Sequence, residues 1–189
     1  MADQLYLSYW LERFREQNML RRYEKLLRTF PFSRLSTQGS VLRIYAVDQT
    51  LPPVFERIFE PPVDPGSVIS SAGEFLNADT ALELESQWDL WQPDDKGEWK
   101  LSPSRASLIC YGPEFTHELD ENIRIEFGMD ANFLPQPELP NHLRMAQSNI
   151  RSLLKLTHDL DDALGGERRL WSESGENFAE KLQRIIAGE

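Results

Sequence analysis

The sequence has little of what a disulfide-bonded or membrane-inserted protein requires. A single cysteine, Cys110, excludes an intrachain disulfide, which is typical of proteins from a reducing compartment. The first residues do not form a signal-peptide pattern, and no apolar run approaches the ~20 residues of a membrane-spanning helix. We therefore expect a cytoplasmic protein that does not insert into a membrane.

Motifs that bind cofactors or activate nucleophiles are missing as well. There is no glycine-rich phosphate loop and no G-x-S-x-G elbow, and the three histidines have no zinc-ligand spacing. His158 and Asp162 lie four residues apart on a predicted helix and could share a ligand, but a solvated helix end is the simpler interpretation. We expect no cofactor and no metal, and the sequence leaves open whether a reaction is catalysed.

Positive charge is scarce, with 20 basic against 31 acidic residues and a net charge of −11. This charge repels the phosphates of nucleic acids and anionic membranes, so we expect no binding to nucleic acid. It suits a basic partner, and it also keeps a protein soluble. One basic cluster, either a local anion site or the solvated face of a helix, contains Arg13, Arg15, Arg21, Arg22, Lys25 and Arg28.

Strict alternation of apolar and polar residues marks the stretch 79–130 as a sheet with one buried face. It predicts three consecutive strands, Thr80–Trp91, Trp99–Tyr111 and Ile123–Met129. The turn-forming residues 93–97 separate the first two strands. We therefore expect an antiparallel meander.

Two further strands, Leu5–Leu11 and Ser40–Val47, flank a helix that begins after Asn18 and ends before Pro31. A strand, a helix and a strand in this order favour a βαβ unit with parallel strands and a right-handed crossover. Pro103 cannot donate a backbone hydrogen bond, so it predicts a bulge or a free edge in its strand.

The remaining apolar patterns predict helices at 52–60, 65–76, 141–164 and 174–187. Together these elements indicate an α+β fold, a two-layer sandwich in which a mixed five-stranded sheet has helices mainly on one face. We expect a single domain over 1–189, with 166–189 as a separately docked C-terminal helix. The expected core contains Leu7, Leu26, Ile44, Leu84, Leu108, Ile125, Ile150 and Leu153.

The candidate site is the other face of the sheet, where aromatic and charged side chains alternate with the core residues. Its members are Tyr6, Trp10, Arg43, Tyr45, Glu83, Glu85, Trp91, Arg124 and Glu126. Aromatic residues mixed with charges are typical of a recognition surface. We therefore expect a non-catalytic binding or regulatory domain of unknown specificity, with a protein partner or a homodimer on this face. Coverage by the last helix or by a loop is the alternative.

A different class of function is a small enzyme. Glu83, Glu85 and Asp89 share one strand face, and Glu126 would join them if the strands were neighbours in register. Close carboxylates perform acid–base chemistry or hold a divalent ion. The competing interpretation is a polar sheet face in which Arg43 and Arg124 neutralise the carboxylates through cross-strand ion pairs.

Overall fold

The computed structural model describes residues 3–174 and 177–188. Its strands are β1 (Gln4–Trp10), β2 (Ser40–Ala46), β3 (Phe55–Phe59), β4 (Thr80–Pro93), β5 (Trp99–Tyr111), β6 (Ile123–Met129) and β7 (Glu167–Ser172). Its helices are α1 (Glu16–Thr29), α2 (Pro65–Gly73), α3 (His142–Leu164) and α4 (Phe178–Ala187), with one 3-10 turn, η1 (Asp130–Phe133). Within the described residues the strands form one antiparallel sheet in the order β3-β2-β4-β5-β6-β1-β7. The α+β class is therefore confirmed.

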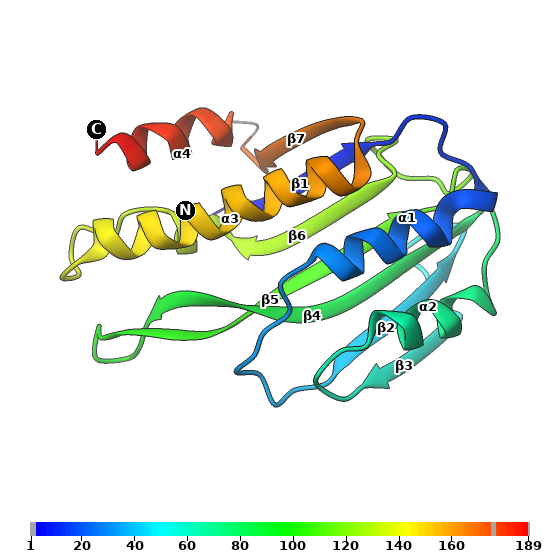
Figure 1. Ribbon diagram of the computed structural model, residues 1–189, viewed down its shortest axis with the longest axis horizontal. Coiled ribbons are helices and arrows are strands. Elements are labelled where there is room, and N and C mark those ends of the chain that lie inside the picture. Colours follow the sequence, from blue (N-terminus) through cyan, green and yellow to red (C-terminus); the bar gives the residue numbers. More distant parts are fainter. Residues whose placement is uncertain (1–2, 175–176, 189) are drawn as a thin grey trace.

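The predicted meander is confirmed by the pairing of β4 with β5 and of β5 with β6. Leu84 lies opposite Leu108, and Leu108 lies opposite Ile125. β4 and β5 continue beyond the rest of the sheet as a two-stranded ribbon (Figure 1). Pro103 lies in this ribbon, where β5 pairs with β4 alone because β6 reaches only Ser107–Cys110. The proline therefore occupies a free strand edge, one of the two outcomes that its missing N–H predicts.

The expected mixed sheet with a βαβ unit is wrong. β1 and β2 do not pair with each other, because β4, β5 and β6 lie between them in the sheet. β1 instead pairs antiparallel with β6 and β7, and β2 pairs antiparallel with β3 and β4. The connection through α1 thus crosses the sheet rather than joining neighbouring strands, and every strand pair is antiparallel.

The expected helix at 52–60 is also wrong, because Phe55–Phe59 is the edge strand β3. The apolar spacing of this segment fits either a helix or a short strand, and the strand places Phe59 in the core and Ile58 on the opposite side. Ile58 is 61% exposed. Prolines at 52–53 and 61–62 leave too few residues between them for a stable helix.

Among the described residues the sheet has seven strands rather than the expected five. The two unexpected strands are β3 and β7. β7 follows the turn at Gly165 and Gly166, both of which have positive φ. At Gly166 a Cβ atom would lie 2.3 Å from the carbonyl oxygen of Trp10, so a larger residue cannot occupy this position. The chain can therefore reverse tightly after α3 and add β7 beside β1.

The core fills the space between the sheet and the helices. The eight residues predicted for it are all fully buried. Tyr23 on α1 donates a hydrogen bond of 2.9 Å to the carbonyl oxygen of Leu108, which joins the helix to the sheet. Phe178 and Leu182 of α4 belong to the same hydrophobic cluster, so residues of the last helix share this core.

The starts of α1 and α2 are each held by a side-chain hydrogen bond. The Asp64 carboxylate accepts from Ser67 N at the start of α2, as expected for a residue followed by proline. α1 begins three residues earlier than expected, at Glu16, and Asn18 lies inside its first turn, where its Oδ1 accepts from Arg15 N. The basic residues Arg21, Lys25 and Arg28 are exposed along α1, as expected for a solvated helix face.

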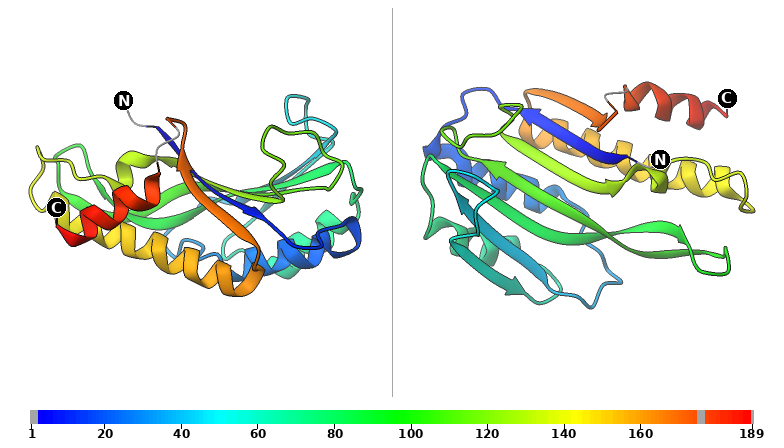
Figure 2. Two further views of the ribbon diagram at one scale, coloured as in Figure 1. Left: turned by 90° about the horizontal axis from the view of Figure 1, so that it is seen from above. Right: turned by 180° about the vertical axis from the view of Figure 1, so that it is seen from behind.

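The molecule has two layers, the sheet and the helices that pack on one of its faces (Figure 2). α1, α2 and α3 cover one face of the sheet, and α4 lies beside α3 and β7 (Figure 2). On the opposite side, the loops at 47–54 and 112–122 rise from one end of the sheet (Figure 2). Among the described residues, no helix covers this second face. No helix in the described part of the chain is long and apolar enough to cross a membrane.

Candidate functional site

The candidate site is the side of the sheet that points away from α1, α2 and α3, here called the open face. Strand register arranges its residues in rows that cross the sheet. One row contains Glu56, Arg43, Glu83, Ile109, Arg124, Ser8 and Arg169. The next row contains Ile58, Val41, Glu85, Ser107, Glu126, Tyr6 and Trp171. Since neighbouring strands lie ~4.8 Å apart, each row brings together side chains that are distant in sequence.

Ion pairs link four strands, β3, β2, β4 and β5, on one half of the open face. The guanidinium group of Arg43 on β2 contacts Glu56 at 2.9 Å and Glu85 at 3.1 Å. Arg105 on β5 reaches the same Glu85 oxygen at 2.6 Å. Glu85 is therefore neutralised by two arginines, as the ion-pair interpretation of this face predicts.

A cavity of about 280 Å³ lies on the other half, over β5, β6 and β1. Its lining consists of Gln4, Tyr6, Arg105, Ser107, Glu126, Gly128 and Glu173. The Tyr6 ring stacks on Trp171 with centroids 4.4 Å apart, and its hydroxyl donates to Glu173 Oε1 at 3.2 Å. The stack and the hydrogen bond hold one aromatic wall of this cavity in place. Two carboxylates and an aromatic ring therefore lie around one polar hollow.

Arg124 connects the cavity to the far end of the open face. Its guanidinium carbon lies 5.6 Å from the Tyr6 ring and 5.5 Å from the Tyr111 ring. Its nitrogen atoms contact Glu121 at 2.5 Å and Glu126 at 3.8 Å. Cation–π contacts and a short ion pair together fix this side chain.

The far end of the open face lies beneath the 112–122 loop. His117 stacks on Tyr111 with ring centroids 3.9 Å apart and an angle of 11° between the planes. Phe115 packs against the same tyrosine, and Tyr45 lies against this small cluster. The Tyr111 hydroxyl donates to Gln49 Oε1 at 3.3 Å, which joins the 47–54 loop to the same cluster. Loop coverage, one of the expected alternatives, therefore applies to this end of the face.

Hydrogen bonds of His117 favour its charged form. Its Nδ1 lies 3.2 Å from the carbonyl oxygen of Phe115, and its Nε2 lies 2.7 Å from the carbonyl oxygen of Glu121. Carbonyl oxygens only accept, so both contacts are hydrogen bonds only when both ring nitrogens carry protons. Burial lowers the pKa of His117, but the Glu121 carboxylate and these carbonyls outweigh burial and raise its pKa above 6.5.

The carboxylates of the open face differ in their ionisation. Burial raises the pKa of Glu126, Arg124 opposes this increase, and the nearby charge of Glu83 adds to it. Glu121 is fully buried, and burial alone raises its pKa, but hydrogen bonding to His117 and the charge of Arg124 lower it overall. Glu121 is therefore held charged, while Glu126 binds a proton more readily than an ordinary glutamate.

Of the nine predicted site residues, all but Trp91 lie in the rows of the open face, beside them or at the loop end of this face. Tyr6, Arg43, Tyr45, Glu83, Glu85, Arg124 and Glu126 lie within the rows or beside them. Trp10 lies at the loop end, where its Nε1 donates to the carbonyl oxygen of Leu119 at 3.1 Å. Trp91 is on the ribbon, six residues beyond Glu85 or roughly 20 Å along the strand. Trp91 is therefore not brought together with the other members.

Four residues of this region were not predicted from the sequence: Tyr111, His117, Glu121 and Trp171. Tyr111 could have been found, because it alternates with Cys110 and Leu108 on the second expected strand of the meander. No pattern indicates that Glu121 and His117 fold back over the sheet. Trp171 depends on β7, for which no strand was expected.

The carboxylates do not form a compact metal site. Ser107 lies between Glu85 and Glu126 in their row, which places these two residues two strands apart, about 10 Å. Asp89 accepts hydrogen bonds from Ser33 Oγ at 2.5 Å and from Arg34 N at 2.9 Å. Within residues 3–174 and 177–188, no group of three or more His, Cys, Asp or Glu side chains is placed to hold a metal ion.

The chain was compared with models of protein families, with curated proteins and with solved structures. None of the three comparisons finds a match.

Proposed function

We propose that this chain is a non-catalytic binding protein whose open face holds a positively charged segment of a protein partner. One observation carries the proposal: the cavity lining holds two carboxylates, Glu126 and Glu173, against one cation, Arg105, which is paired with Glu85 outside the lining. No helix of the described part of the chain covers this cavity (Figure 2). Carboxylates and an aromatic face are the groups that recognise a lysine or arginine side chain.

Charge decides between the partners that such a face could take. The net charge of −11 attracts a basic segment and repels nucleic acid. A two-fold dimer through this face would bring Glu126 and Glu173 near the same residues of a second copy. Like charges across an interface disfavour that arrangement. A basic partner therefore fits better than self-association.

The test uses a fluorescein-labelled octalysine peptide as the probe, and fluorescence anisotropy as the measurement. We expect binding at low salt that weakens at about 0.15 M salt, where the Debye length is about 8 Å. The double variant Glu126→Gln/Glu173→Gln should weaken peptide binding about tenfold, because each of its two substitutions removes one carboxylate from the cavity.

The matched control is Glu74→Gln/Glu180→Gln, which removes the same charge from exposed positions directly after α2 and on α4. This control should bind like the unmodified protein. Equal loss in both double variants would mean that the peptide senses only the overall charge, and the proposed site would be wrong.

A second candidate function is acid–base catalysis at Glu126, supported by the raised pKa of this residue and its place in the cavity. A general acid at neutral pH needs a pKa near the working pH. Carbon-13 NMR titration of the Glu126 carboxyl group measures it directly. A pKa near 7 would favour catalysis, and a pKa of about 5 or less would leave binding as the better proposal.

A further inference from the structure

The cavity on the open face contains a buried serine whose hydroxyl has no protein partner. Ser107 of β5 lines this cavity and is 4% exposed, and its hydroxyl makes no hydrogen bond within the described part of the chain. Its oxygen still reaches the cavity, since it is not one of the polar atoms cut off from solvent. A buried hydroxyl that faces a polar hollow is a group that a ligand can satisfy.

The two carboxylates of the same lining each have one oxygen engaged. Glu173 Oε1 accepts from the Tyr6 hydroxyl at 3.2 Å, and Glu126 Oε1 lies 3.8 Å from Arg124 Nη1. The other oxygen of each carboxylate has no partner among residues 3–174 and 177–188. The free oxygens therefore come from two separate residues. A guanidinium binds best to both oxygens of one carboxylate, so this arrangement does not favour arginine.

The faces of the Tyr6 ring are also taken. Trp171 stacks on this ring with centroids 4.4 Å apart, and the guanidinium carbon of Arg124 lies over it at 5.6 Å. Trp171 belongs to β7 and Arg124 to β6, and these strands lie on opposite flanks of β1, so the two groups cover opposite faces of the ring. Methylated ammonium groups are recognised by free aromatic faces. The oxygen acceptors are therefore the recognition groups that remain.

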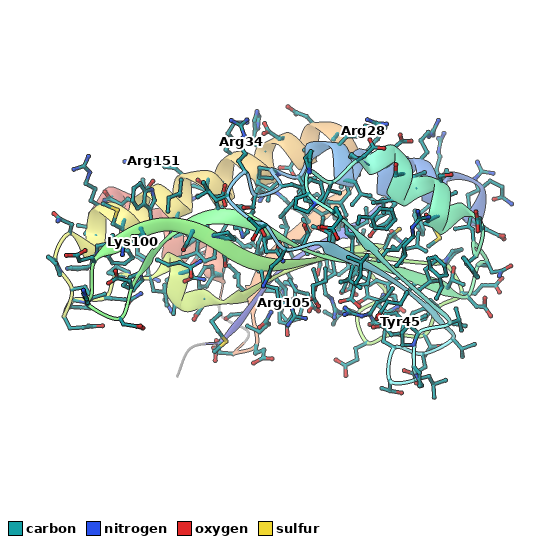
Figure 3. All side chains as sticks on the ribbon, turned by 90° about the horizontal axis from the view of Figure 1, so that it is seen from below. Arg28, Arg34, Tyr45, Lys100, Arg105 and Arg151 are labelled. Carbon is teal, nitrogen blue, oxygen red and sulfur yellow. The ribbon has the colours of Figure 1, made fainter. Side chains whose placement is uncertain are left out.

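The arginines nearest the cavity are already paired. Arg105 lies on the side of the sheet away from the helices (Figure 3) and contacts Glu85 at 2.6 Å. Arg124 contacts the fully buried Glu121 at 2.5 Å. These pairs leave the cavity with a surplus of acceptors and of negative charge, which suits a cation that donates several hydrogen bonds.

We propose that this cavity binds the primary ammonium group of an unmethylated lysine side chain. Its three N–H groups would donate to Ser107 Oγ and to the free oxygens of Glu126 and Glu173. A trimethylated lysine keeps the charge but has no N–H group, and arginine has a planar fork of donors. The inference rests on the proposed function and narrows the basic partner to a segment that presents lysine.

The test compares three fluorescein-labelled octapeptides of equal side-chain charge, octalysine, octaarginine and the octamer of Nε-trimethyllysine. Fluorescence anisotropy measures their binding to the unmodified protein. Because the charge is the same, attraction to the acidic chain is similar for all three, and a difference reports the shape and donors of the cation. We expect octalysine to bind about fivefold more tightly than either other peptide, the effect of about one hydrogen bond.

Ser107→Ala should remove this preference. The variant should weaken octalysine binding about fivefold and leave the trimethyllysine peptide unchanged, because a trimethylated nitrogen cannot donate to the hydroxyl. Ser102→Ala is the matched control, since Ser102 lies on the same strand outside the cavity lining. This control should leave all three affinities unchanged. The comparison of peptides on the unmodified protein does not depend on the folding of either variant.

Three results would overturn the inference. Equal affinities of the three peptides, each weakened by Glu126→Gln/Glu173→Gln, would reject lysine selection and leave the proposed function standing. An equal loss for all three peptides in Ser107→Ala would show that Ser107 only supports the shape of the cavity. No binding by any peptide would reject both this inference and the proposed function.

Discussion

Consecutive residues of β4 face two different surroundings, the apolar core and the charged open face. The comparison separates the residues that stabilise the fold from those available to a binding partner. Leu82 and Leu84 point toward the helices and are fully buried in a continuous apolar core. Glu83 and Glu85 point to the open face, where Glu85 is held by two arginines and remains partly exposed. Apolar burial dominates folding free energy, whereas partly exposed ion pairs contribute little. The helix side should therefore control stability, and the open face should be largely free to serve recognition.

The largest expected effect tests this contrast on two adjacent residues. Leu84→Ala should lower the free energy of unfolding by about 2–5 kcal/mol, because it leaves a cavity in a fully buried site. Glu83→Ala, its neighbour on the open face, should change stability by less than about 1 kcal/mol. Urea denaturation measures both, and similar losses for the two variants would contradict the proposed division between faces.

Arg124 is the expected exception on the open face. Arg124→Met would leave the fully buried Glu121 with His117 as its remaining charged neighbour. We expect a loss of about 2–3 kcal/mol, somewhat below the 3–5 kcal/mol typical of a broken buried pair. Adding Glu121→Leu should restore much of the stability, since no unpaired charge remains. A double variant as unstable as Arg124→Met alone would show that packing, rather than charge, is responsible.

A smaller effect should depend on pH. The raised pKa of His117 means that its contribution is complete below pH 6.5 and is lost as the pH rises through the folded-state pKa. The lowered pKa of Glu121 means that its contribution is present above pH 4.5 and is lost as the pH falls. Arg124 stays charged throughout and Tyr111 stays neutral, because burial raises the pKa of its hydroxyl. This part of the open face should therefore be most stable between pH 4.5 and 6.5.

Melting temperatures measured from pH 5 to 9 test this behaviour. The decrease above pH 6.5 should be smaller in His117→Gln, and it should persist in His158→Gln, a control at an exposed histidine of α3. An unchanged pH profile in His117→Gln would exclude His117 as its cause.

The smallest expected effect concerns an ion pair that is short but exposed. Arg105 contacts Glu85 at 2.6 Å, yet its side chain is 69% exposed. Arg105→Ala should therefore change the free energy of unfolding by less than about 1 kcal/mol. Chemical denaturation at low and high salt measures it, and a larger loss would mean that the open face contributes more to stability than its exposure suggests.

The sequence predicts the middle of this fold better than its edges. The meander, the core residues and the long helix α3 have many periodic positions, and their boundaries were predicted within a few residues. β3 has five residues and β7 has six, too few for a pattern that separates a strand from a helix. The strand order depends on pairings between distant segments, so no local pattern could exclude the βαβ arrangement.

The candidate site was predictable to the extent that it follows strand alternation. Tyr6, Glu83 and Arg124 alternate with core residues along their strands and lie in the rows of the open face. Trp91 also alternates, but the pattern does not show that its part of β4 extends past the other strands. Glu121 and His117 reach the open face through a loop, whose path is set by tertiary contacts alone.

The place of β1 between β6 and β7 also constrains how the chain is made. β1 leaves the ribosome before both of its neighbours in the sheet, residues 123–129 and 167–172. At about 5–20 residues per second, Ile123 of β6 emerges roughly 6–23 s after Trp10. Until then the apolar residues Leu5 and Leu7 have no strand beside them. The nascent chain therefore presents an unpaired apolar strand until β6 has been synthesised, which is the kind of segment that chaperones bind.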